Sequence, residues 1–143
     1  MPKFTTAALT ACAAAAITLL GAAPAQAATN PYTPAQICGS GYKTVSGGYF
    51  GLTGADMYVM YNSAAGRNCV AVVKRSNIGT ATSVGAGFKL SSDPTWRAGV
   101  NYELGNFKYY AVSPTKYYAK GKCIDIYGVS GSSKVQQFKV FCG

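Results

Sequence analysis

Residues 57–74, with the sequence MYVMYNSAAGRNCVAVVK, decide the fold. Two runs rich in valine, tyrosine and methionine flank residues 63–67 (SAAGR), a short connection of small and polar residues. β-Branched and aromatic residues favour strands, and a short glycine-containing connection between two such runs is typical of a β-hairpin. We therefore expect residues 57–62 and 68–74 to form two antiparallel strands.

The same alternation of strand-forming runs and turn residues continues on both sides of this hairpin. The other candidate strands are residues 42–50, 80–90, 107–112, 122–127 and 135–142, with turns at 91–94 and 113–115. Only residues 33–37 favour a helix, because Thr33 can cap it, Pro34 suits its first position and Gly39 follows its end. Seven short strands predict an all-β fold, a small antiparallel sandwich or barrel.

The first 27 residues indicate a secretory signal peptide. Lys3 provides a positive start, an apolar run follows, and residues 25–27 (AQA) offer the small residues that a cleavage site needs. Gly21 and Pro24 interrupt the apolar run and no basic cluster follows it, so we expect no stable membrane anchor.

A lipoprotein cleavage site at Cys12 is the alternative, because residues 9–12 (LTAC) fit the required pattern. A lipidated cysteine follows the apolar region, whereas here residues 13–20 continue it. We therefore expect Cys12 to be removed with the signal peptide.

The remaining domain, residues 28–143, is strongly basic. The whole chain has 13 lysines and arginines against 4 acidic residues, a formal net charge of +9. One basic residue lies in the signal peptide, so 12 basic and 4 acidic residues leave the domain at +8. A chain of this length suits one domain around one core.

Four cysteines remain in the domain: Cys38, Cys69, Cys123 and Cys142. An even number in an exported protein indicates disulfides, and four cysteines allow three pairings. Cys123 and Cys142 flank the turn-rich residues 128–133, and a hairpin there would bring them together, which favours Cys38 with Cys69 as the second pair. Without a CxxC pair or any histidine, we expect no metal site.

The composition excludes the commonest hydrolytic sites. The chain has no histidine, which Ser/His/Asp and Cys/His arrangements both require, and oxidised cysteines are not nucleophiles. A two-carboxylate glycosidase would need Glu103 to converge with Asp125, Asp93 or Asp56. The presence of four acids supports this only weakly, so we expect no enzymatic activity and no cofactor.

Asp125 has two alternative environments. Strand alternation places it on the face of Cys123 and Tyr127, opposite Ile124 and Ile126. If the cysteine face is buried, the pKa of Asp125 should rise unless a lysine or backbone donor compensates. Two isoleucines outweigh a half-covered cysteine in transfer free energy, so we expect Asp125 to be solvated.

Aromatic and basic residues are interleaved most densely between positions 102 and 122. Flat rings stack on sugars, and ammonium groups attract phosphates and carboxylates, so an anionic cell-wall polymer is the expected partner. In the competing interpretation, adjacent tyrosines point to opposite faces of a strand, half of the rings belong to the core, and the lysines protect strand edges. The lysines are scattered and form no nucleic-acid motif, so no nucleic-acid partner is expected. The candidate binding residues are Tyr102, Lys108, Tyr109, Tyr110, Lys116, Tyr117, Tyr118, Lys120 and Lys122.

Several motifs carry a family resemblance. They are residues 30–42 (NPYTPAQICGSGY), 61–63 (YNS), 68–70 (NCV) and 121–123 (GKC), followed by a cysteine near the end. With them the chain resembles the secreted spore-associated protein A family of Streptomyces and related actinomycetes. The resemblance implies export and association with the spore or hyphal surface, its cysteine positions agree with structural disulfides, and it supplies no catalytic residues.

We therefore expect a secreted, non-catalytic, cationic protein associated with the spore or cell surface. With the resemblance, the expected partner is an anionic cell-wall or spore-surface polymer. The first alternative is a protein-binding module such as an enzyme inhibitor. Trp96, in residues 94–97 (PTWR), is its candidate anchor because tryptophan and arginine are enriched at binding hot spots, although a core position for Trp96 is favoured. The glycosidase is the second alternative.

Overall fold

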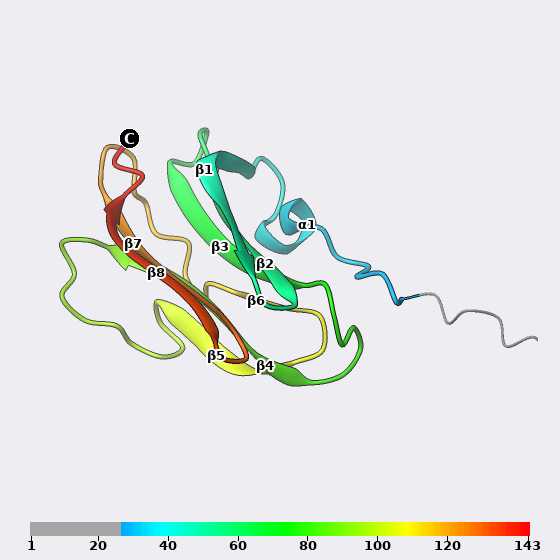
Figure 1. Ribbon diagram of the computed structural model, residues 1–143. Coiled ribbons are helices and arrows are strands. Elements are labelled where there is room, and N and C mark those ends of the chain that lie inside the picture. Colours follow the sequence, from blue (N-terminus) through cyan, green and yellow to red (C-terminus); the bar gives the residue numbers. More distant parts are fainter. Residues whose placement is uncertain (1–26) are drawn as a thin grey trace, which may run out of the picture.

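The computed structural model describes residues 27–143; apart from Ala27, the predicted signal peptide, with Cys12, lies outside them. Two four-stranded antiparallel sheets pack face to face, and a short helix covers part of one outer face (Figure 1). The predicted all-β sandwich is therefore confirmed. The elements are α1 (Pro34–Cys38), β1 (Lys43–Leu52), β2 (Ala55–Asn62), β3 (Arg67–Lys74), β4 (Thr82–Leu90), β5 (Tyr102–Phe107), β6 (Tyr110–Val112), β7 (Ile124–Ser130) and β8 (Ser133–Val140).

The first sheet has the strand order β1-β2-β3-β6 and the second has the order β5-β4-β7-β8. The predicted hairpin of β2 and β3 forms with Asn62 opposite Arg67 and an unbroken register to Ala55 and Lys74. The predicted helix also forms, with a capping box in which Thr33 and Gln36 bond each other's backbone N–H groups.

The core lies between the sheets and follows strand alternation. Every second residue of the central strands points inward, and each buried aliphatic or aromatic side chain contributes roughly 1.5–3 kcal/mol of transfer free energy. The inward residues of the four central strands include Met57, Val59, Val70, Val72, Val84, Ala86, Phe88, Ile124 and Ile126.

The single predicted strand 107–112 is wrong, because the chain crosses between the sheets there. β5 ends at Phe107 in the second sheet, and β6 begins at Tyr110 in the first. The connection is held by backbone bonds, in which Gly79 donates to the carbonyl of Lys108 and Lys74 to that of Tyr109. Residues 27–143 consequently form eight strands rather than seven.

The predicted turn at 128–133 is shorter than expected. Gly128 continues β7, because it pairs with Ala86 of β4 and Val135 of β8. Met57 from the facing sheet packs against it, so a Cβ at this position would clash with the Met57 sulfur. Gly131, with φ of 58°, lies in the turn itself, between Ser130 and Ser133. One of the two glycines therefore serves packing and the other serves the turn.

Both favoured disulfides are present. Cys38–Cys69 joins α1 to β3 across a Cα–Cα distance of 5.9 Å, and both cysteines are buried. Cys123–Cys142 joins the start of β7 to the segment after β8, as the predicted hairpin requires, and Cys142 is exposed.

The expectation that Asp125 is solvated is wrong, because both faces of β7 are covered. Ile124 and Ile126 face the core, while the Asp125 side chain is only 7% exposed on the other face. There its Oδ2 lies 2.6 Å from the ammonium of Lys89, and its Oδ1 accepts bonds from the Ser91 hydroxyl and the backbone N–H of Lys139.

These contacts lower the pKa of Asp125. Burial raises it, but the bonds from Lys89, Ser91 and the Lys139 backbone outweigh burial, and the pKa lies below its ordinary value of 3.8. The donors that would compensate a buried carboxylate are thus all present.

Candidate functional site

The structure distributes the candidate binding residues over three places. Lys108, Tyr109 and Tyr110 lie at the crossing between the sheets, and Tyr102 lies on the outer face of the second sheet. Residues 116–122 belong to the long connection between β6 and β7. The segment is therefore not one continuous face.

The crossing forms a groove together with the segment before α1. The Tyr32 ring packs edge-on against Tyr109 and Tyr110, with centroid distances of 5.4 and 5.1 Å. Asn30 fixes this segment, since its side-chain amide donates to the carbonyls of Lys74 and Tyr109 at 3.0 and 2.8 Å. We call this surface the tyrosine groove; its cavity volume is about 400 Å³ and its lining is Tyr32, Glu103, Phe107, Lys108, Tyr109, Tyr110 and Val112.

The expectation that Tyr109 and Tyr110 point to opposite faces is wrong. Tyr109 precedes β6 rather than lying within it, so strand alternation does not separate the pair. Both rings contact Tyr32. The groove therefore gathers three aromatic rings beside one lysine.

Lys108 supplies the positive charge of the groove. It is exposed and forms no ion pair within residues 27–143, and Glu103 is the one acid among the lining residues. An exposed, unpaired ammonium beside flat rings can attract a phosphate or carboxylate while the rings contact sugars.

A second hollow of about 410 Å³ adjoins the tyrosine groove, because Tyr32 lines both; Tyr58 is another of its lining residues. Arg75 and Asp56 line it too and form an ion pair of 2.9 Å, and Tyr49 donates to Asp56 at 2.9 Å. This hydrogen bond to the Asp56 carboxylate raises the pKa of Tyr49. Aromatic and cationic groups thus continue beyond the tyrosine groove.

Lys116 and Tyr117 have structural contacts instead. The Lys116 ammonium donates to the Cys38 carbonyl at 2.5 Å and lies 5.3 Å from the centroid of the Tyr42 ring. Tyr117 packs edge-on against Phe88 of the core at 5.7 Å. For Tyr117 the competing interpretation describes the observed contact, whereas Lys116 bonds the end of α1 rather than protecting a strand edge.

Tyr118, Lys120 and Lys122 remain exposed on the same connection. Tyr118 lies over the turn of the β2–β3 hairpin, where a Cβ at Gly66 would lie 2.5 Å from its ring. Neither lysine has an ion-pair partner in the described part of the chain. They form a second, separate group of available charges.

Tyr102 joins Trp96 rather than the tyrosine groove. The ring centroids of Trp96, Tyr102 and Tyr127 lie 5.6–6.1 Å apart, and the Lys89 ammonium lies 5.4 Å from the Trp96 centroid. Trp96 is half-buried, outside the core between the sheets. A shallow pocket of about 230 Å³ lies over this cluster, with Leu104 exposed at its edge.

The four carboxylates occupy different surroundings. Asp56 pairs with Arg75, Asp93 with Arg97 and Asp125 with Lys89. Glu103 lines the tyrosine groove, where none of the aspartates is a lining residue. The structure therefore brings no second carboxylate into the groove with Glu103.

Sequence reasoning missed Tyr32, Asn30 and Arg75 as neighbours of the candidate residues. Asn30 and Tyr32 belong to the NPY start of the family motif, which marked them as distinctive without indicating a contact. Their position depends on the segment before α1 crossing the β3–β6 edge.

Within residues 27–143, α1 is too short to cross a membrane.

Fold and surface together define a small, disulfide-linked β-sandwich that carries an aromatic groove with one unpaired lysine. No family model matches the chain, and no solved structure matches it. The chain is 35% identical to Spore-associated protein A of Streptomyces coelicolor over 94% of its own length and 85% of that relative. It therefore belongs to the spore-associated protein A family.

Proposed function

We propose that this protein is a secreted, non-catalytic protein of the spore or cell surface that binds anionic wall polymers through the tyrosine groove. The observation that carries the proposal is the exposed Lys108 beside Tyr32, Tyr109 and Tyr110. The name of the Streptomyces relative supports spore association, and the domain's net charge of +8, from 12 basic and 4 acidic residues, supports attraction to anionic polymers.

The groove is suited to a polymer that combines sugars with phosphate or carboxylate groups. Rings offer contact area to a sugar at a small entropic cost, because Tyr32, Tyr109 and Tyr110 already hold one another in place. Lys108 supplies a charge whose attraction depends on salt, since the Debye length falls from about 10 Å at 0.1 M to about 3 Å at 1 M.

Cosedimentation with purified actinomycete walls and spores tests this function. We expect binding at low salt that weakens steadily as salt rises, and about threefold weaker binding for Lys108→Gln, as for one exposed charge contact. Tyr32→Ala should weaken binding with little change in salt dependence, because it removes a ring and no charge.

Lys134→Gln is the matched control, because Lys134 is an exposed lysine on β8 of the other sheet. It removes the same charge and should leave binding close to wild type. Equal losses for Lys108→Gln, Lys134→Gln and the Lys120→Gln/Lys122→Gln variant would show diffuse attraction and reject the groove. Binding that does not change with salt concentration, or no binding at low salt, would reject an anionic wall polymer as the ligand.

A protein-binding module is the second candidate function, and the Trp96 cluster favours it. Leu104 is 51% exposed beside Trp96 and Tyr102, an arrangement of aromatic and aliphatic groups that suits a protein partner. Inhibition assays against secreted proteases test it, with Leu104→Ser as the variant that should abolish inhibition. Absence of inhibition alongside wall binding would favour the first function.

A further inference from the structure

The inward-facing residues of β3 are apolar in the middle and polar at both ends. Val70 and Val72 lie in the core, while Asn68 and Lys74 continue the same face towards the two ends of the sandwich. Both polar residues are buried, with 4% and 2% of their surface exposed. A buried polar group requires hydrogen-bond partners, so Asn68 and Lys74 must each find partners at their own end of the sandwich.

At the Lys74 end the chain itself satisfies the buried ammonium. The Lys74 ammonium donates to three backbone carbonyls, those of Asn77, Thr80 and Phe107, at 2.9, 2.6 and 3.2 Å. These bonds use all three donors of the ammonium. The Lys74 ammonium therefore has no donor left for a ligand.

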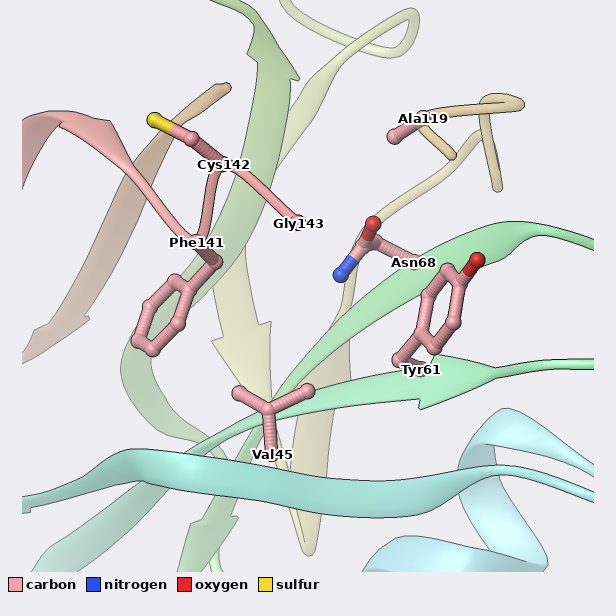
Figure 2. A pocket seen from close by; sticks show the side chains of 7 residues that line it. All are labelled: Val45, Tyr61, Asn68, Ala119, Phe141, Cys142 and Gly143. Atoms are coloured by element: carbon pink, nitrogen blue, oxygen red, sulfur yellow. The ribbon is translucent and has the colours of Figure 1, made fainter. Parts of the chain in front are cut away.

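The Asn68 end is open, with a pocket of about 280 Å³ (Figure 2). Asn68 and Tyr61 are paired across β3 and β2, and their side chains stand side by side at the pocket. The Asn68 amide group donates to the Met60 carbonyl at 3.3 Å, which leaves its Oδ1 as an acceptor. Neither that oxygen nor the Tyr61 hydroxyl has a hydrogen-bond partner within residues 27–143.

The other walls of the pocket are largely apolar. Val45 of β1 and the Phe141 ring lie below and across from the polar pair, and Ala119 closes a further side (Figure 2). Cys142 and Gly143 complete the rim, and the Cys123–Cys142 disulfide ties this rim to β7. No acidic or basic side chain lines the pocket.

We infer that this pocket binds a small, uncharged, largely apolar molecule that carries a hydroxyl group. A hydroxyl matches the polar pair, since its O–H donates to Asn68 Oδ1 while its oxygen accepts from the Tyr61 O–H. An anionic group would lose its hydration without meeting a basic side chain, which is costly. The pocket exceeds the roughly 150 Å³ cavity that accommodates benzene, so it suits a molecule of about ten non-hydrogen atoms.

An NMR titration of the disulfide-bonded protein with 4-ethylphenol and ethylbenzene tests the pocket. The two probes differ by one hydroxyl, and a ligand of this size should bind in the roughly micromolar to millimolar range. We expect 4-ethylphenol to bind about tenfold more tightly and to shift the amide signals of Asn68, Ala119 and Phe141. Tyr61→Phe should weaken its binding about fivefold to tenfold, as for one lost hydrogen bond.

Tyr58→Phe is the matched control, because Tyr58 lies on the same strand with its side chain on the outer face. It should leave binding unchanged, while Ala119→Leu should abolish binding by filling the pocket. Equal affinity for the two probes, equal effects of the two tyrosine variants, or shifts confined to the Trp96 region would each overturn the inference. Neither probe is anionic, so failure here leaves wall binding by the tyrosine groove untouched.

Discussion

Asp125→Asn is expected to lower the free energy of unfolding by about 3–5 kcal/mol, the usual cost of removing one partner from a buried ion pair. The carboxylate holds three segments, since it bonds Lys89 of β4, Ser91 after β4 and the backbone of Lys139 in β8. An asparagine keeps the shape but leaves the Lys89 ammonium, only 5% exposed, without its counterion. Urea unfolding at neutral pH measures the loss.

Two further variants separate the ion pair from general damage. Asp93→Asn removes a carboxylate from the same region, but its pair with the half-exposed Arg97 is accessible to water, so stability should change little. Lys89→Met/Asp125→Leu should recover most of the lost stability, because apolar residues often replace a buried pair without cost. An Asp125→Asn protein as stable as the wild type would contradict this view of the carboxylate.

The same carboxylate should govern stability in acid. Its pKa in the folded protein lies below 3.8, so the folded state binds the proton less readily than the unfolded state. Its stabilising contribution is therefore present above about pH 4 and is lost as pH falls through the lower, folded-state pKa. Melting temperatures from pH 6 down to pH 2 should fall more steeply for the wild type than for Lys89→Met/Asp125→Leu.

Local patterns were sufficient to predict most of the strands. β2 and β3 combine strand-forming residues with a short connection, and their register follows from the turn between Asn62 and Arg67. The capping residues of α1 also act within a few positions. Cys123 and Cys142 could be paired because the β7–β8 hairpin determines their neighbourhood.

Features that depend on contacts between distant segments could not be predicted from local sequence patterns. The break between Phe107 and Tyr110 arises because the two strands join different sheets, and the sequence across the break stays rich in aromatic residues. β5 itself was missed up to Phe107, since its residues 103–106 (ELGN) have low strand propensity. Its pairing with β4 is a property of the whole sheet.

Asp125 shows the same limit at the level of one side chain. The comparison of transfer free energies correctly placed Ile124 and Ile126 in the core. It assumed that the opposite face was open, whereas Lys89, Ser91 and the end of β8 cover it. The tyrosine groove is comparable, because Tyr32 reaches it from a distant part of the chain.

Loss of the Cys38–Cys69 disulfide is expected to be the second large effect. The chain-entropy model gives about 3.7 kcal/mol for its sequence separation of 31 and about 3.2 kcal/mol for the separation of 19 in Cys123–Cys142. Cys38–Cys69 also fixes α1 on the outer face of the first sheet, where both sulfurs are buried beside Met60 and Tyr42. Cys38→Ala/Cys69→Ala should therefore lose more stability in urea than Cys123→Ala/Cys142→Ala.

Exposure should set the order in which the two disulfides are reduced in the folded protein, because a thiolate must reach a sulfur to attack it. Cys142 is exposed, whereas Cys38 and Cys69 are only 1% and 0% exposed. Limited dithiothreitol followed by alkylation and mass spectrometry should label Cys123 and Cys142 first, with native near-ultraviolet circular dichroism retained. Simultaneous labelling of all four cysteines would mean that reduction proceeds through global unfolding. The expectation that burial protects Cys38 and Cys69 in the folded protein would then be wrong.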